Sequence, residues 1–278
     1  MVKSGDLSIR LYELLRDQAK TRTIADVRLG RAYIAVRLDN GRLGLSGFPT
    51  HGAGLPAPLG LPHDDGCPGL SSVPAAEPSE EGVIFPPPTT LIGTSAAAVL
   101  KWLTERGAPL KKALALATAN ALIRQSHIDM EGDSFELFHL TPKDKVAMVG
   151  RFSPLVDRIA NKGASLTVLE KDAAKGQVLS KRERRTILKG CTVAIITATT
   201  ILYDDLEDIL NDLDAPRHVA LLGPSTPMLP DLFNDTPVTH LGGVRIIDSS
   251  QILPIVSAGG GTQAMRPYLE MTNLFLRK

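Results

Sequence analysis

The sequence predicts an α/β fold in which a small N-terminal α+β domain precedes a doubly wound parallel sheet. Residues 145–250 alternate strand and helix patterns, and four of the strands are continuous apolar runs, as expected of a parallel sheet covered on both faces. Residues 30–47 instead hold two β-prone runs joined by the turn DNGR, which is a strong hairpin signal. The 278 residues are enough for two modest domains, which we place at 1–130 and 131–278.

The N-terminal domain is expected to open with an amphipathic helix over residues 8–20. Its apolar side chains recur at steps of three and four residues and form one face: Ile9, Tyr12, Leu15 and Ala19. Two alternating runs, RAYIAVRL and RLGLSG, predict a small antiparallel sheet. Two helices follow, one near 94–106 with Thr94 or Ser95 as its cap, and one over 109–127 with Pro109 in its first turn.

Residues 47–90 predict a long irregular loop, because they hold 10 Pro and 7 Gly in 44 positions. Within it, the segment PHDDGCPG brings together His63, Asp65 and Cys67, and a transition metal ion accepts such donors. The segment has no paired C-x-x-C and no H-x-x-x-H, and loops rich in Asp and Gly are also simply well solvated. Two hypotheses stay open here: a metal site and an ordinary polar loop.

The second domain is predicted to contain five strands with helices between them. We expect strands at 145–150, 165–170, 191–198, 218–223 and 242–248, and helices at 153–163, 181–190 and 203–213. Ser153 is expected to cap the first of these helices, with Pro154 at its first position. Because crossovers between parallel strands are right-handed, these units predict a doubly wound sheet.

Ligands of open α/β sheets bind where the strands end, and several polar loops follow the predicted strands. The exits are GRFSP at 150–154, EKD at 170–172, TATT at 197–200 and GPSTP at 223–227. Glu170 lies 20 residues after Gly150, where an acidic residue grips a ribose in nucleotide-binding sheets. The first exit lacks G-x-G-x-x-G, which favours the interpretation of Glu170 as a solvated strand-end carboxylate over a ribose contact.

Asn120 lies on the alanine-rich helix ALALATANALI, on a largely apolar surface. A buried amide must find hydrogen-bond partners. Asn120 is therefore expected either to reach a ligand or a loop such as GPSTP, or to bond a neighbouring backbone within its own domain. The loop TATT and the loop GPSTP offer hydroxyl groups, which serve ordinary turns as well as ligands.

Composition excludes several classes of function. The net charge is +1, with 31 basic and 30 acidic residues, and aromatic residues make up only 4%. We therefore expect no nucleic-acid partner. No apolar stretch reaches about 18 residues, so no membrane partner is expected. The two cysteines lie far apart in sequence, and the N-terminus does not resemble a signal peptide, which together predict a cytoplasmic protein.

Four segments resemble the family described as "putative heavy-metal chelation". They are VAMVGRFSPLVDRI, TATTILYDDLEDIL, LLGPSTPMLPDLF and VSAGGGTQ, and GPSTP is the most specific element. The resemblance implies an N-terminal domain similar to the enolase N-terminal fold, followed by a Rossmann-like domain. It also implies a cleft between the two, in which a metal or a metal-bearing small molecule is bound.

The resemblance, with Glu170 added from the strand-exit argument, gives a set of candidate ligand-binding residues. They are Asn120, Gly150, Arg151, Phe152, Glu170, Thr199, Thr200, Gly223, Pro224, Ser225 and Thr226. One departure concerns TATT, since Tyr203 and Asp205 stand where an Asn and a Thr are common in the family. The departure weakens any inference of shared chemistry at that loop.

The leading hypothesis is a protein that binds a metal or a metal-containing small molecule at the interdomain cleft. One alternative is an enzyme that uses a nucleotide or an S-adenosylmethionine-like cofactor at Gly150 and Glu170. Another is a ligand sensor without catalysis. The sequence leaves open whether the protein is an enzyme. The expected partners are a small-molecule or metal ligand and a second copy of the chain in a homodimer.

Overall fold

The computed structural model describes residues 6–49, 88–124, 128–170 and 179–276. The N-terminal part comprises α1 (Asp6–Ala19), β1 (Ile24–Leu29), β2 (Tyr33–Leu38), β3 (Leu43–Gly47), η1 (Pro88–Leu91), α2 (Ala96–Leu100), η2 (Lys101–Thr104) and α3 (Pro109–Leu122). The remainder begins with β4 (Met130–Glu131), η3 (Ser134–Phe138), β5 (Lys145–Val149), α4 (Ser153–Asn161), β6 (Ser165–Leu169), α5 (Lys181–Gly190) and β7 (Val193–Thr197). It continues with η4 (Ala198–Tyr203), α6 (Leu206–Asn211), β8 (His218–Leu222), η5 (Pro230–Phe233), β9 (His240–Ile246), α7 (Ser249–Ser257), α8 (Thr262–Met265), η6 (Arg266–Tyr268) and β10 (Leu269–Phe275).

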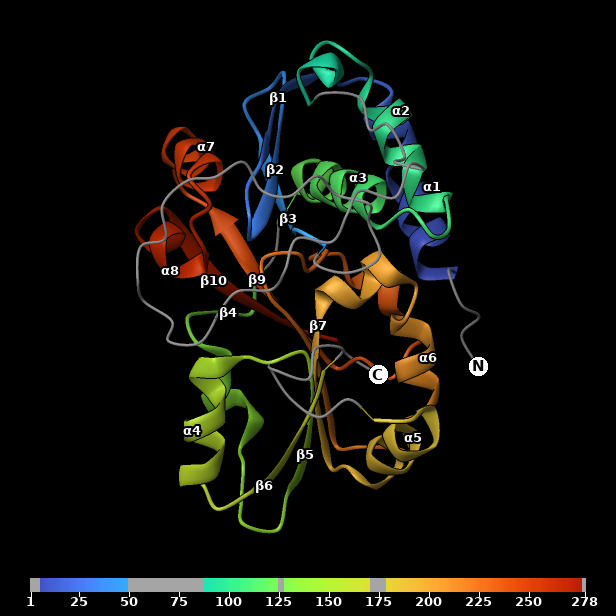
Figure 1. Ribbon diagram of the computed structural model, residues 1–278, viewed down its shortest axis with the longest axis vertical. Helices are drawn as coiled ribbons and strands as arrows, with labels where there is room; N and C mark the ends of the chain where they lie inside the picture. The colour runs from blue at the N-terminus through green and yellow to red at the C-terminus, as the bar shows by residue number, and fades with distance from the viewer. Residues whose placement is uncertain (1–5, 50–87, 125–127, 171–178, 277–278) are drawn as a thin grey trace, which may run out of the picture.

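These elements form two sheets, and the predicted fold class is confirmed (Figure 1). The small sheet has the antiparallel order β1-β2-β3, and the large sheet has the order β4-β10-β9-β8-β7-β5-β6. Strands β5 to β9 are parallel, whereas β10 runs antiparallel to β9 and to β4. The parallel part therefore has a 2-1-3-4-5 order, in which the direction of winding reverses beside β5.

Helices cover both faces of the parallel sheet. Successive residues of β5 point to opposite faces: Val146 and Met148 pack with α4, and Ala147 packs in the core that includes α5 and α6. Figure 1 shows α4 on one side of the strands and α5 and α6 on the other. Because both faces are buried, these strands can consist almost entirely of apolar residues.

The small sheet is also covered on both faces. Ile34 and Val36 belong to the core that contains α1, α2 and α3, while Ala35 packs with α7 and α8. Helix α3 approaches β3 closely enough that a Cβ on Gly44 would lie 2.1 Å from the Ala117 carbonyl oxygen. Both the small side chains of α3 and the lack of a side chain at Gly44 therefore allow the helix and the strand to make this close contact.

Several local expectations were wrong. Ile9 is 46% exposed, and the buried face of α1 consists of Leu7, Ser8, Leu11, Leu15 and Ala19. Ser95 caps α2 as expected, but the predicted helix at 94–106 divides into α2 and η2, and the predicted helix at 109–127 ends at Leu122. Ser153 is the first helical residue of α4 rather than its cap. Strand β1, helix α7 and the antiparallel strand β10 were not predicted.

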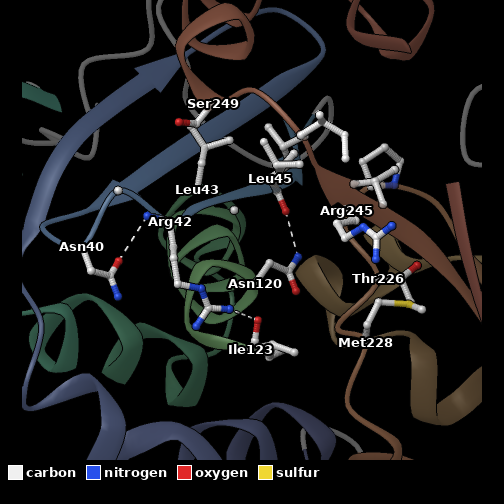
Figure 2. Close-up of a pocket in the computed structure, with 16 residues that line it drawn as sticks. Asn40, Arg42, Leu43, Leu45, Asn120, Ile123, Thr226, Met228, Arg245 and Ser249 are labelled. Atoms are coloured by element: carbon white, nitrogen blue, oxygen red, sulfur yellow. Dashed lines mark hydrogen bonds between the residues drawn. The ribbon is translucent and has the colours of Figure 1, made fainter. Parts of the chain in front are cut away.

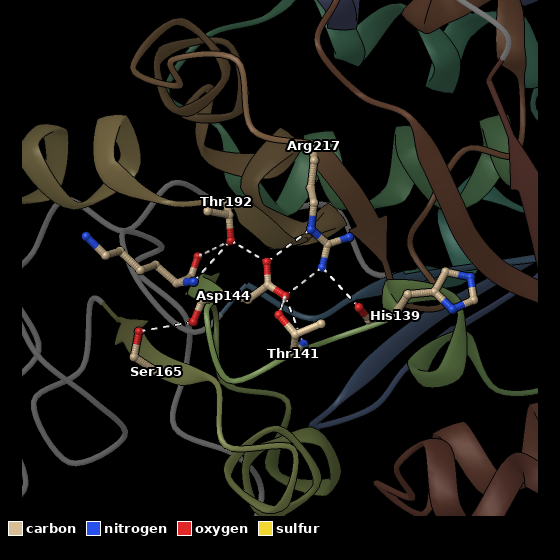
Figure 3. A network of polar contacts seen from close by, with 7 residues as sticks. His139, Thr141, Asp144, Ser165, Thr192 and Arg217 are labelled. Atoms are coloured by element: carbon tan, nitrogen blue, oxygen red, sulfur yellow. Dashed lines mark hydrogen bonds and ion pairs between the residues drawn. The ribbon is translucent and has the colours of Figure 1, made fainter.

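A charged network ties the amino ends of β5, β7 and β8 together (Figure 3). Asp144 is 7% exposed and accepts hydrogen bonds from Arg217 Nε at 3.0 Å, Thr192 Oγ1 at 2.7 Å and the Thr141 backbone N–H at 2.9 Å. The hydrogen bond from Arg217 is the largest of the effects that hold the pKa of Asp144 well below its usual range. This network lies at the amino ends of the strands, opposite the edge where ligands bind, so we assign it to stability.

Candidate functional site

The carboxyl ends of β5 and β7 meet at the point where the strand order reverses. Gly150 follows β5 with a φ of 81°, in the region that favours glycine. A Cβ at this position would lie 2.5 Å from Thr197 Cγ2, so the backbone passes directly over the end of β7. The predicted exits at 150–154 and 197–200 are therefore in contact.

The same edge contacts the N-terminal part through a chain of short interactions. Thr197 Oγ1 lies 3.0 Å from Thr199 Oγ1, and Thr199 packs against Gly47 at the end of β3. The Gly47 N–H donates to Ser225 Oγ at 2.7 Å. Asn120 Nδ2 then donates to the Ser225 carbonyl at 3.1 Å and to the Leu45 carbonyl at 2.8 Å. Asn120 thus bonds both the small sheet and the GPSTP loop. The expected bond to a loop and the expected bond to a backbone of its own part of the chain are therefore both present.

The hydroxyl groups of the predicted loops are mostly engaged within the protein. Thr200 Oγ1 donates to the Thr197 carbonyl at 2.7 Å, and Thr226 Oγ1 donates to the Gly242 carbonyl at 2.9 Å. Ser225 and Thr226 are 2% and 3% exposed. These side chains fix the loops against β9 and β3, and their contact with a ligand stays a prediction.

The remaining predicted residues surround the first exit or shape the GPSTP loop. The Arg151 N–H donates to Glu170 Oε1 at 2.5 Å, so this carboxylate, at the end of β6, binds the backbone of the loop that follows β5. The Phe152 N–H points to Met148 Sδ at 3.4 Å. Gly223, with a φ of 114°, donates its N–H to the Gly242 carbonyl at 2.9 Å. Glu170 therefore has a structural partner that the sequence did not reveal.

A pocket of about 450 Å³ opens between the two parts of the chain (Figure 2). It is lined by the turn after β2, the end of α3, the GPSTP loop and the end of β9. Of the predicted residues it gathers Asn120, Pro224 and Thr226, and it adds residues that the sequence analysis missed. These include Asn40, Arg42, Leu43, Met228, Val244, Arg245, Ile247 and Ser249.

The two arginines of the pocket differ in charge balance. Arg245 Nε donates to Glu270 Oε2 at 3.0 Å and its Nη2 donates to Glu131 Oε1 at 2.6 Å, so its charge is compensated. Arg42 donates from Nη1 to the Leu122 carbonyl at 2.9 Å and from Nη2 to the Ile123 carbonyl, at the end of α3. In the part of the chain that the structure describes, no carboxylate pairs with Arg42. Burial, followed by the nearby charges of Arg124 and Arg22, lowers the pKa of Arg42.

Asn120 presents an unsatisfied acceptor in this region. Both of its amide hydrogen bonds are made by Nδ2, and Oδ1 is buried without a partner. Figure 2 shows the Asn120 nitrogen turned toward Leu45 and the oxygen turned away from it. A buried acceptor without a donor costs about 1–3 kcal/mol, so a bound group that donates to Oδ1 would be stabilised.

The described residues offer little to a bare metal ion. Among them, no three His, Cys, Asp or Glu side chains converge as ligands. His63, Asp65 and Cys67 lie outside the described residues, so their metal site stays a prediction. Cys191 is buried, and burial raises the pKa of its thiol to about 11, which disfavours the thiolate that binds metals.

Comparison with known families decides the membership of the chain. A family model described as "Putative heavy-metal chelation", DUF364, matches residues 133–275, and a second model with the same description, DUF4213, matches residues 12–123. The chain belongs to this family. The resemblance seen in its sequence is thereby confirmed.

No helix among the described residues combines the length and hydrophobicity required to cross a membrane.

The relatives share the fold and leave the activity open. A DUF364 family protein with unknown function from Pyrococcus horikoshii is 17% identical, with a TM-score of 0.75 over 97% of this chain and 100% of its own. A DUF364 protein with unknown function from Desulfitobacterium hafniense is also 17% identical, with a TM-score of 0.69 over 96% and 98%. An uncharacterized protein of Methanocaldococcus jannaschii is 26% identical over 151 residues, which cover 52% of this chain and 58% of that relative.

Proposed function

We propose that this protein binds a small metal-bearing molecule in the pocket between its two parts. The observation that carries the proposal is the pocket itself, because both parts of the chain form it. Its lining residues include Asn120, whose Oδ1 is buried without a donor, and Arg42, which no carboxylate of the described residues pairs with. Its volume of about 450 Å³ lies within the range of small-molecule sites. The family description supports the metal.

The donors in the pocket favour a metal complex over a bare ion. The side chains that line it supply amide, hydroxyl and guanidinium groups together with the thioether of Met228, and none of them is His, Cys, Asp or Glu. A divalent ion beside Arg42 would meet a like charge, whereas the anionic shell of a metal complex would meet an opposite one. The metal is therefore expected to enter with its own organic ligand.

The test measures nickel bound per chain after dialysis against three probes: nickel chloride, nickel–citrate and nickel–triethylenetetramine. We expect at least one of the two complexes to bind more tightly than nickel chloride. Ser249→Trp, which fills the pocket, should abolish that binding, and Gln251→Trp on the exposed side of α7 should retain it.

The outcome that contradicts the proposal concerns the loop at 47–90. If nickel chloride binds best, and a variant with Ala at His63, Asp65 and Cys67 loses it, the metal site lies in the loop. If none of the probes binds, but a nucleoside or S-adenosylmethionine raises the melting temperature, the cofactor-dependent enzyme becomes the better hypothesis. Homodimer formation and cytoplasmic location stay predictions.

A further inference from the structure

Two residues that line the pocket carry a group without a matching partner among the described residues: the Arg42 guanidinium has no carboxylate partner, and the buried Asn120 Oδ1 has no donor. Arg42 bonds the carbonyls that end α3, and Asn120 lies one turn earlier on the same helix. Both residues line the pocket. Figure 2 shows Arg42 coming from the β2–β3 turn and Asn120 from α3.

Arg42 favours an anion because, among the described residues, its charge stays uncompensated although it bonds the end of α3. Its two carbonyl acceptors are neutral, so they use N–H groups and leave the charge in place. Arg22 and Arg124 add positive charge nearby, and among the described residues Arg22 lies 3.9 Å from the Asp39 carboxylate. A planar guanidinium that retains donors is suited to a carboxylate.

Asn120 favours a ligand that can donate a hydrogen bond. The orientation of its amide is fixed, because Nδ2 donates to two carbonyls and exchanging the two ends would place Oδ1 against both. Oδ1 is therefore held as an acceptor. Oδ1 itself is buried, so a hydroxyl or amine on the ligand would supply the missing donor once the side chains that cover Oδ1 move aside.

We propose that the pocket selects a hydroxycarboxylate or aminocarboxylate, with the carboxylate paired to Arg42 and the hydroxyl or amine donating to Asn120 Oδ1. This inference rests on the proposed function and specifies its ligand. Molecules of this class also hold metal ions through the same kinds of oxygen and nitrogen atoms. Leu43, Met228 and Val244 supply the apolar part of the wall.

The experiment uses the full chain and isothermal titration with citrate and tricarballylate, which is citrate without its hydroxyl. We expect citrate to bind wild type, and Arg42→Gln to weaken it about tenfold or more, while Arg42→Lys retains most of the affinity. Both variants disturb the end of α3, so the difference between their affinities for citrate measures the contribution of the positive charge at position 42. Arg16→Gln, on the exposed side of α1, serves as the control and should leave the affinity unchanged.

The hydroxyl contact is tested by a ligand-and-variant cycle. Tricarballylate should bind wild type about tenfold more weakly than citrate, and Asn120→Ala should bind the two ligands equally. The inference is overturned if citrate fails to bind wild type, if Arg42→Gln equals Arg16→Gln, or if Asn120→Ala keeps the preference for citrate. Binding of nickel–triethylenetetramine without citrate binding would reject this inference and leave the proposed function standing. If citrate binds and nickel does not strengthen its binding, the proposed function is rejected, and the assignment of the carboxylate and hydroxyl contacts stands.

Discussion

At the residue scale, Asp144 shows how a single carboxylate can hold three strands together. It accepts bonds from Arg217, Thr192 and Thr141, and its side chain is nearly inaccessible to solvent. Removing one member of such a network leaves the others without their partner. The charge of Asp144 is therefore expected to stabilise the fold.

Asp144→Asn should lower the free energy of unfolding by about 2 kcal/mol at pH 7, measured by urea denaturation. Because the folded pKa of Asp144 is depressed, its contribution is complete above its unfolded pKa near 4 and is lost as the pH falls below that value. The cost of the substitution should therefore shrink as the pH falls below about 4. Asp157→Asn, on the exposed face of α4, is the matched control. An equal cost in both variants would reject the role of the network.

A second residue-scale prediction concerns His218. Burial, and then the neighbouring His240, lower its pKa to about 4, and its Nε2 lies 3.3 Å from His240 Nδ1. The unfolded chain binds a proton near pH 6.5 that the folded chain does not, so stability is complete above that pH and falls as the pH drops toward 4.

When the pH is lowered from 7 to 5, His218 should reduce the free energy of unfolding of the wild type by on the order of 1–2 kcal/mol. His218→Gln should lose that part of the dependence on pH, and His139→Asn, at an exposed position whose φ is 45°, should keep it. Identical pH profiles for wild type and His218→Gln would show that His218 titrates normally.

At the element scale, the contact of α3 with β3 sets the geometry of the pocket. Asn120 and the carbonyls that Arg42 bonds all belong to α3 or its end, so a shift of this helix moves both proposed ligand contacts. Gly44 permits that contact, since a Cβ would meet the backbone of α3.

Gly44→Ala should lower the free energy of unfolding by about 2–3 kcal/mol, because the helix must move away from the strand. It should also weaken ligand binding. Gly190→Ala, at the end of α5 with open space around its Cβ position, is the control and should be neutral or slightly stabilising. Thermal unfolding of the two variants distinguishes a packing effect from a general loss of glycine. Comparable melting temperatures would contradict the close contact.

The elements that the sequence predicted well were those with local signals. The strands of the parallel sheet are continuous apolar runs, and the turn DNGR fixes a hairpin by itself, with Gly41 at a φ of 81°. Strand β10 has no such signal, because it is an antiparallel strand added next to β9 after α7, α8 and η6. Ile9 was assigned to the wrong face because a three- and four-residue step fits more than one stripe of α1.

The site was predicted in part for a related reason. Strand exits are visible in a sequence, and three of them do meet at one edge. The pairing of Arg42 with the end of α3 joins residues about 80 positions apart, and no local pattern announces it. Hydroxyl groups in the GPSTP loop were expected to serve either a ligand or an ordinary turn, and their partners in the structure are carbonyl and amide groups of distant strands.

At the scale of the whole molecule, the two parts share one continuous apolar core. The core that contains α1 and α3 also contains residues of β7 and β8, and buried polar pairs cross between the parts. The Lys112 ammonium, which is 1% exposed, pairs with Asp204, and the Leu7 N–H donates to Glu207 Oε1 at 3.0 Å. The pocket is therefore a gap in an otherwise packed interface, and its walls are held on both sides.

We propose that a metal complex occupies this gap. The most direct measurement is the anomalous scattering of nickel in crystals soaked with nickel–citrate. We expect one strong peak inside the pocket, among Arg42, Asn120 and Met228, with carboxylate density beside the Arg42 guanidinium. A peak at His63, Asp65 and Cys67 with an empty pocket would contradict it.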